Sequence, residues 1–210
     1  MPNVIRIIDV SAIDTMPRDL CVVGNRIWIA GEQKGRIYQL DMNGKLISSF
    51  APAVYPYGVA SDGKFLYTVS HIFTYFAAIQ RFNFKGNFIN EIAINPTAWQ
   101  PECITFDGKY IYYAGPLSET IYKIDPTFKT VSSFSTAGFD ANPVGLTFDG
   151  KYLYMVGTQH DSIYQLDLLG NVIRTIDIDA LDDTPTGIAF DGKYFYQAGK
   201  AGSVIYQLSL

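Results

Sequence analysis

The chain has 210 residues and a formal net charge of −4; 48% of its residues are hydrophobic and 15% are aromatic. An acidic balance does not match the clustered lysine and arginine of a nucleic-acid-binding protein, and no segment keeps the ~18 apolar residues of a membrane-spanning helix. The first residues also lack the charged and apolar regions of a secretory signal peptide. We therefore expect no nucleic-acid or membrane partner, and a cytoplasmic or particle-associated location.

Five glycines mark a repeat that runs through the whole chain. Each follows a proline by seven residues, and the glycines are Gly24, Gly63, Gly108, Gly150 and Gly192. Their spacings are 39, 45, 42 and 42 residues, and counting from Gly192 through the C-terminus and on from residue 1 to Gly24 gives another 42. The intervals add up to the chain length, so the repeat closes on itself. Because one such unit cannot bury its apolar face alone, the repeats predict a single closed domain over residues 1–210.

Each repeat contains four short strand patterns separated by turns, as in a β-propeller blade. The predicted blades cover residues 17–50, 56–92, 101–134, 143–176, and 185–210 together with 3–9. In the last repeat the strands are Gly187–Phe190, Tyr194–Ala198 and Val204–Leu208, with Asp191-Gly192 as a two-residue hairpin turn. The chain then ends without a fourth strand. Residues 3–9 match residues 171–177 of the preceding repeat, so the N-terminal strand is expected to pair with Val204–Leu208. The sequence predicts an all-β, five-bladed propeller with four antiparallel strands per blade.

The repeated pattern is Pro-x-Gly-Ile-Ala-x-Asp-Gly, an aromatic strand, and then Ile-Tyr-x-Leu-Asp-x-x-Gly-Asn. It resembles the pattern of NHL-repeat propellers over the whole chain, although that family more often has six blades than five. The resemblance implies the fold. It implies no single function, since the family includes scaffolds, receptors and enzymes.

One aromatic residue recurs four positions after each turn glycine, at Trp28, Tyr67, Tyr112, Tyr154 and Tyr196. A residue at the same strand position in every blade is expected to pack between blades, with its phenol oxygen bonded at the edge of the packing. The two cysteines, Cys21 and Cys103, lie at different offsets in non-neighbouring repeats. We expect both to be buried free thiols.

The two ends of the strands differ in how uniform their loops are. The Asp-Gly and Asp-x-x-Gly turns fall on one side of the ring, here called the turn face, and vary little. The loops between second and third strands and between blades fall on the opposite side, the variable face, where binding residues are expected. There, Arg18, Tyr57 and Glu102 are predicted at the mouth of the central channel, beside Val144 and Thr186. They are the candidate contacts for a small molecule or glycan; an Arg18–Glu102 ion pair that simply fills the mouth is the alternative.

Glu102 is the one carboxylate at its offset in the repeat. Residues 101–105, Pro-Glu-Cys-Ile-Thr, resemble the segment that holds an acidic residue in lactonase-type and glutaminyl-cyclase-type propellers. This resemblance implies a role in metal binding or proton transfer, but the companion Asn and Asp ligands are not evident. No Ser-His-Asp, phosphate-loop or paired-cysteine motif is present.

We therefore expect a non-enzymatic binding or scaffolding propeller that needs no cofactor or metal. One alternative is a metal-dependent hydrolase or lyase centred on Glu102. The other is a lectin-like carbohydrate-binding propeller, which would require similar polar and aromatic sets in every variable loop, whereas these loops are dissimilar.

The loop between the second and third strands of blade two differs from its four counterparts. It is three residues longer and holds three aromatics within four residues, Phe73, Tyr75 and Phe76, beside His71 and Ile72. Exposed apolar patches of this kind mark partner sites. The hairpin is predicted to contact another protein chain or a second copy of this one; the alternative is that it folds back over its own blade.

Overall fold

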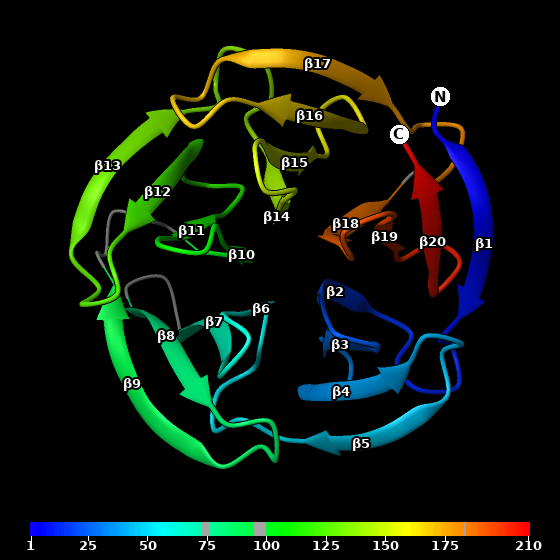
Figure 1. Ribbon diagram of the computed structural model, residues 1–210, viewed down its shortest axis with the longest axis vertical. Helices are drawn as coiled ribbons and strands as arrows, with labels where there is room; N and C mark the ends of the chain where they lie inside the picture. Colours follow the sequence, from blue (N-terminus) through cyan, green and yellow to red (C-terminus); the bar gives the residue numbers. More distant parts are fainter. Residues whose placement is uncertain (73–75, 95–99, 183) are drawn as a thin grey trace.

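The computed structural model describes residues 1–72, 76–94, 100–182 and 184–210, and contains five four-stranded antiparallel sheets around a central axis (Figure 1). Blade one consists of β2 (Pro17–Val23), β3 (Arg26–Gly31), β4 (Arg36–Asp41) and β5 (Leu46–Phe50). Blade two consists of β6 (Gly58–Ser61), β7 (Leu66–Ile72), β8 (Phe76–Phe82) and β9 (Phe88–Ile94). Blade three consists of β10 (Cys103–Phe106), β11 (Ile111–Ala114), β12 (Thr120–Ile124) and β13 (Thr130–Ser135). The predicted five-bladed propeller is confirmed.

Blade four consists of β14 (Pro143–Phe148), β15 (Leu153–Gly157), β16 (Ser162–Leu166) and β17 (Val172–Asp177). Blade five combines β18 (Pro185–Phe190), β19 (Phe195–Gly199) and β20 (Val204–Ser209) with β1 (Asn3–Asp9) from the other end of the chain. β1 runs antiparallel to β20, with Asn3 opposite Ser209 and Asp9 opposite Val204. The predicted closure of the ring is confirmed. None of the described residues belongs to a helix that could cross a membrane.

The core lies between neighbouring blades, and the recurring aromatic residue of each second strand is buried in it. Tyr196 of blade five packs with Leu20 and Ile27 of blade one, and Trp28 packs in turn with Val59 and Leu66 of blade two. Three equivalent clusters join the remaining blades. The predicted inter-blade role of these aromatics is confirmed. Each blade is thus held by two apolar interfaces, which makes the ring a rigid support for its loops.

The turns between the first and second strands have a centre one residue later than predicted. Asp191 and Tyr194 are the paired flanking residues, since the Asp191 N–H donates to the Tyr194 carbonyl at 3.1 Å, so Gly192 and Lys193 form the centre. Gly192 has a φ of +97°, a conformation that favours glycine. Asp191 is therefore not a central residue of the turn, and its role is to accept hydrogen bonds with its side chain. Its carboxylate accepts the N–H groups of Lys193 and Tyr194 and the hydroxyl of Tyr196.

The aspartate–tyrosine hydrogen bond, here called the lock, recurs at Asp62, Asp107 and Asp149. Each of them accepts a hydrogen bond from the hydroxyl of the tyrosine five residues later at 2.8–2.9 Å. Blade one lacks it, because Trp28 has no hydroxyl and Val23 occupies the aspartate position. The lock ties the buried aromatic to the turn, so the turn-face carboxylates bond to their own blades.

Candidate functional site

A hollow of roughly 400 Å³ opens on the variable face at the mouth of the channel. Blades one, three, four and five contribute its walls. The lining residues are Arg18, Glu102, Pro116, Asn142, Val144, Thr158, Asp161, Thr184, Pro185, Thr186 and Lys200. Its volume lies within the ~300–1,000 Å³ typical of small-molecule sites. Of the residues predicted at the mouth, Arg18, Glu102, Val144 and Thr186 line the hollow.

Arg18 connects the predicted site residues to one another. Its Nη1 donates to Glu102 Oε2 at 2.8 Å, and its guanidinium carbon lies 5.4 Å from the centroid of the Tyr57 ring. Its Nε donates to Glu32 Oε2 at 2.6 Å, and Lys200 Nζ lies 3.2 Å from the same oxygen. The structure therefore brings Arg18, Tyr57 and Glu102 together as predicted, and adds Glu32 and Lys200 from two outer loops. That they contact a ligand stays a prediction.

The side chain of Glu102 is buried at the base of this network. Burial raises its pKa above the ordinary value, because removal from water disfavours the charged form. The positive charges of Arg18 and Lys200 act in the opposite direction, and the negative charge of Glu32 raises the pKa further. A carboxyl group whose pKa is raised above its ordinary value binds a proton more readily, and can both accept and donate one during a reaction.

The donor set around Glu102 does not fit a metal ion. The groups closest to its carboxylate are the guanidinium of Arg18 and, through Glu32, the ammonium of Lys200. Among the described residues no three His, Cys, Asp or Glu side chains are arranged to share a cation. A divalent ion prefers several anionic or neutral oxygen and nitrogen ligands, whereas this site places cations there. We therefore derive no step through a metal.

Asp19 lies between this hollow and the rest of the channel and is fully buried. The Val59 N–H donates to its Oδ2 at 3.1 Å, whereas Oδ1 has no hydrogen bond among the described residues. Burial raises the pKa of this carboxyl well above its ordinary value. It fits because the neighbouring inner strand, β18, has Gly187, where an added Cβ would lie 2.4 Å from the Asp19 Cα. The sequence marks Asp19 as the exception at a position occupied by small residues in the other blades.

We expect Asp19→Asn to stabilise the protein at neutral pH. A carboxyl whose pKa is raised on folding contributes full stability below its unfolded pKa near 3.8, and stability falls as pH rises through the folded pKa. Asparagine keeps an acceptor for the Val59 N–H without the charge. At neutral pH, thermal unfolding should show a higher Tm for Asp19→Asn than for wild type, by about 2–4 °C for each kcal/mol gained. The Tm of the variant should also change less between acidic and neutral pH. The exposed Asp179→Asn is the control, and a lower Tm than wild type at neutral pH would refute this reading.

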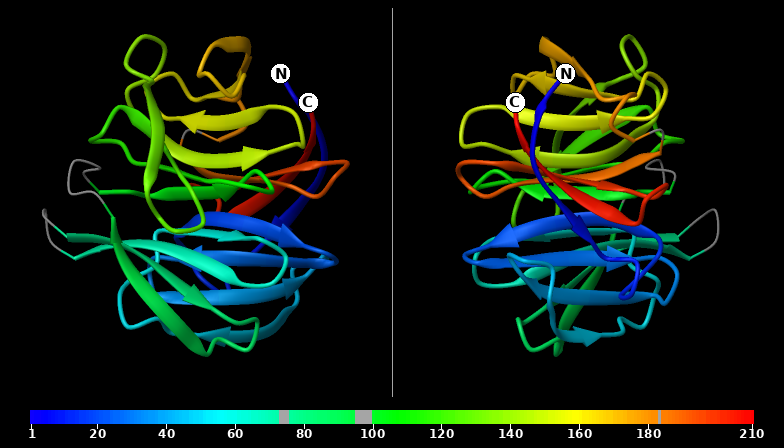
Figure 2. Two further views of the ribbon diagram at one scale, coloured as in Figure 1. Left: turned by 60° about the vertical axis from the view of Figure 1, so that its left-hand side comes forward. Right: turned by 90° about the vertical axis from the view of Figure 1, so that its right-hand side faces the viewer.

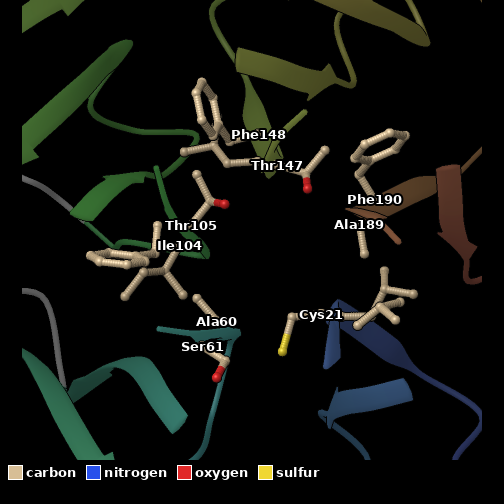
Figure 3. Close-up of a pocket in the computed structure, with 13 residues that line it drawn as sticks. Cys21, Ala60, Ser61, Ile104, Thr105, Thr147, Phe148, Ala189 and Phe190 are labelled. Atoms are coloured by element: carbon tan, nitrogen blue, oxygen red, sulfur yellow. The ribbon is translucent and has the colours of Figure 1, made fainter. Parts of the chain in front are cut away.

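A second, smaller hollow of roughly 100 Å³ lies on the axis toward the turn face (Figure 3). Cys21, Ala60, Thr105, Thr147 and Ala189 come from successive inner strands, β2, β6, β10, β14 and β18, and surround it. Burial raises the pKa of the Cys21 and Cys103 thiols, so neither is an activated nucleophile. Both cysteines are free, as predicted, and Cys103 is buried, but the predicted full burial of Cys21 is wrong because its side chain borders the small hollow and is only partly buried.

The second and third strands of blade two are described up to Ile72 and from Phe76 onward. β7 and β8 stay paired up to Ile72 opposite Phe76, with His71 opposite Ala77. Phe73 and Tyr75, which with Phe76 form the aromatic set predicted to contact a partner, lie outside the described residues. Contact of this hairpin with another chain therefore stays a prediction.

Four residues that line the larger hollow are not predicted from the sequence: Pro116, Asn142, Thr158 and Thr184. They lie in loops that differ from blade to blade in length and chemistry, so no repeat offset marks them. The closed ring brings these loops together. The lining residues could have been identified only by placing each loop beside the loops of the neighbouring blades.

Comparisons with known proteins place the chain among solved propellers. A glutaminyl cyclase from Myxococcus xanthus is similar over 99% of this chain and 95% of its own, with a TM-score of 0.80 and 14% identity. A virginiamycin B lyase from Staphylococcus aureus is similar over 92% of this chain and 66% of its own, with a TM-score of 0.59 and 22% identity. A streptogramin B lyase has a TM-score of 0.55 and 16% identity, over 98% of this chain and 87% of its own.

No family model matches the chain, and no curated protein does. The NHL family is therefore not shown, whereas the five-bladed fold is. The prediction of a non-enzymatic binding or scaffolding propeller is wrong, because these structurally similar propellers are enzymes by name. They favour the enzyme alternative centred on Glu102. At such low identity the likeness establishes the fold alone.

Proposed function

We propose that the protein is an enzyme in which Glu102 transfers protons for a substrate held in the variable-face hollow. The reaction is a cyclisation that expels ammonia, as the name of the glutaminyl cyclase that matches nearly the whole chain suggests. The observation that carries this proposal is the buried Glu102 carboxyl, with its raised pKa, at the wall of an open hollow. The repeat pattern also supports an NHL-type propeller as the scaffold of this enzyme.

The proposed substrate is a peptide with an N-terminal glutamine. Its α-amine nitrogen attacks the side-chain amide carbon, which forms a five-membered lactam, and the bond from that carbon to the amide nitrogen breaks. The Glu102 carboxylate accepts a proton from the attacking amine and delivers it to the departing nitrogen, which leaves as ammonia. Glu102 ends the cycle as a carboxylate, so the reaction needs no oxidant or external reductant. Proton transfer by a positioned side chain contributes ~10²–10⁴-fold to such reactions.

Arg18 and its partners keep Glu102 in position. Nη1 of Arg18 holds Glu102 Oε2, while Glu32 fixes Nε on the other side of the guanidinium. Glu32 is itself held by Lys200, so the arginine is oriented by a chain of charge-assisted bonds. Nη2 of Arg18 has no hydrogen bond among the described residues and is free to donate to a substrate carbonyl oxygen. An oriented donor at that oxygen would stabilise the charge that develops on it during the attack.

The walls of the hollow suit the end of a peptide. Asn142 supplies an amide group, and Val144 and Pro116 supply apolar surface. The hydroxyls of Thr184 and Thr186 already donate to acceptors within the chain. Such a mixture of apolar walls with a few polar groups is usual for a site that orients a small ligand.

Ammonia release from a short peptide with an N-terminal glutamine tests the proposal. The protein should convert this peptide to the lactam form, seen by mass spectrometry as the loss of one ammonia. A peptide with the same composition and an internal glutamine is the control, since its α-amine cannot reach the amide. No acceleration over the buffer rate for the N-terminal peptide would reject the proposed reaction.

A further inference from the structure

The charges of the chain are segregated between its two faces. The turns hold seven lysines, all exposed: Lys45, Lys64, Lys85, Lys109, Lys129, Lys151 and Lys193. They also hold seven aspartates: Asp41, Asp62, Asp107, Asp125, Asp149, Asp167 and Asp191. Five further cations lie at or next to these turns: Arg6, Arg26, Arg81, Lys123 and Arg174. The turn face is therefore basic, and the acidic net charge of −4 comes from the other side of the ring.

The aspartates of the turn face are occupied by their own turns. Asp107 accepts the N–H groups of Lys109 and Tyr110 and the hydroxyl of Tyr112, and Asp149 and Asp191 accept equivalent groups. Asp41 and Asp167, in the outer turns, accept backbone N–H groups. The ion pairs found among the described residues all lie on the variable face. Among the described residues, the lysines of the turn face therefore form no ion pair with a carboxylate.

These lysines sit beside aromatic rings. Lys109 Nζ lies 4.8 Å from the centroid of Tyr110, Lys151 Nζ lies 4.6 Å from Tyr152, and Lys193 Nζ lies 4.7 Å from Tyr194. The outer turn of blade four adds an apolar tip, in which Leu169 is 80% exposed and Leu168 is 38% exposed. Lysine, tyrosine and leucine together on one surface are the residues that anchor a protein at the headgroup level of a bilayer.

We propose that the turn face docks on an anionic lipid bilayer. Side views of the ring show a disc whose strand ends lie at two opposite faces (Figure 2). Because the lysine turns are distributed over all five blades, a planar anionic surface contacts them at the same time. A nucleic-acid duplex is a narrow cylinder and would reach only some of them.

This proposal departs from the expectation of no membrane partner, which rested on the net charge of the whole chain and on the lack of a spanning segment. Docking by the turn face leaves the acidic variable face, with the hollow, directed away from the lipid. It is independent of the reaction proposed above.

Co-sedimentation with vesicles tests the docking surface. The protein should sediment with vesicles that contain phosphatidylglycerol and not with phosphatidylcholine alone, and added salt should release it. Each lysine near an anionic surface strengthens binding by about fivefold, so Lys109→Gln/Lys151→Gln/Lys193→Gln should weaken it on the order of a hundredfold. Leu169→Ser should weaken it further, whereas Leu117→Ser on the variable face should not.

A control with the same change in net charge separates the face from the overall charge. Lys34→Glu/Ala137→Glu alters the variable face by the same −3 as the triple substitution and should leave vesicle binding unchanged. Equal losses in both variants, or no sedimentation with the anionic vesicles, would overturn the proposal. Binding of duplex DNA with the same sensitivity to the triple substitution, and no vesicle binding, would assign the face to nucleic acid instead. All variants alter exposed residues, and their Tm checks that each is folded.

Discussion

Deletion of residues 1–10 is expected to abolish cooperative unfolding. The deletion removes β1, which covers the edge of β20, and with it Ile8 and Val10, which are buried with Leu20 and Tyr196 between blades five and one. Loss of one such buried aliphatic side chain typically costs ~2–5 kcal/mol, and a whole domain is stable by only ~5–15 kcal/mol. The deletion would also leave the outer edge of β20 unpaired, which favours aggregation.

Thermal unfolding followed by circular dichroism measures this effect. A protein without residues 1 and 2 is the matched control, because β1 starts at Asn3 and stays complete. It should melt like wild type, whereas the protein without residues 1–10 should show no sharp transition. If the longer deletion melted as sharply and at the same temperature, β1 would not be what closes the ring.

Glu102→Gln is expected to lower kcat/KM by about 10³-fold while the protein stays folded. Glutamine has the same shape and its amide oxygen can still accept the Arg18 Nη1–H, so the ion-pair network loses one charge and keeps its geometry. What is lost is the group that carries the proton. Because the substrate is held by the walls of the hollow, KM should change little.

Glu119→Gln is the control for this substitution, since Glu119 is an exposed carboxylate in a loop of the same face. It should keep wild-type activity. A Glu102→Gln protein that retained more than about a tenth of the wild-type rate would show that the proton travels by another group.

The fold could be predicted from the sequence because the decisive signal is the spacing of the repeated glycines. Glycines at a constant offset from a proline, with intervals that close on the chain length, require equal units in a ring, and residues 3–9 fit the one strand missing. The turn centre was misplaced by one residue because Asp191 resembles a turn residue in sequence. In the structure it is a side-chain acceptor for Lys193, Tyr194 and Tyr196.

The site was only partly accessible from the sequence. Arg18 and Glu102 stand out as the charged residues at one offset of the repeat, directly after the proline, and this offset places both at the channel mouth. Glu32 and Lys200 are separated by most of the chain and meet at 3.2 Å only because the ring closes. The sequence leaves the enzyme centred on Glu102 as an alternative only, for a related reason. A site assembled from several blades leaves no local motif, and burial, which raises the pKa of Glu102, is a property of the folded ring.

The pH dependence of kcat/KM is the measurement that tests the central claim most directly. If Glu102 transfers the proton, activity should rise with pH through the pKa of its carboxyl, at a pH above the ordinary glutamate value of 4.5. Lys200→Met removes a charge that lowers this pKa and should move the rise to higher pH, whereas Glu32→Gln removes a charge that raises it and should move the rise to lower pH. Opposite shifts in the two variants are the predicted result. A rise that stays at the same pH in both would contradict the assignment of the proton to Glu102.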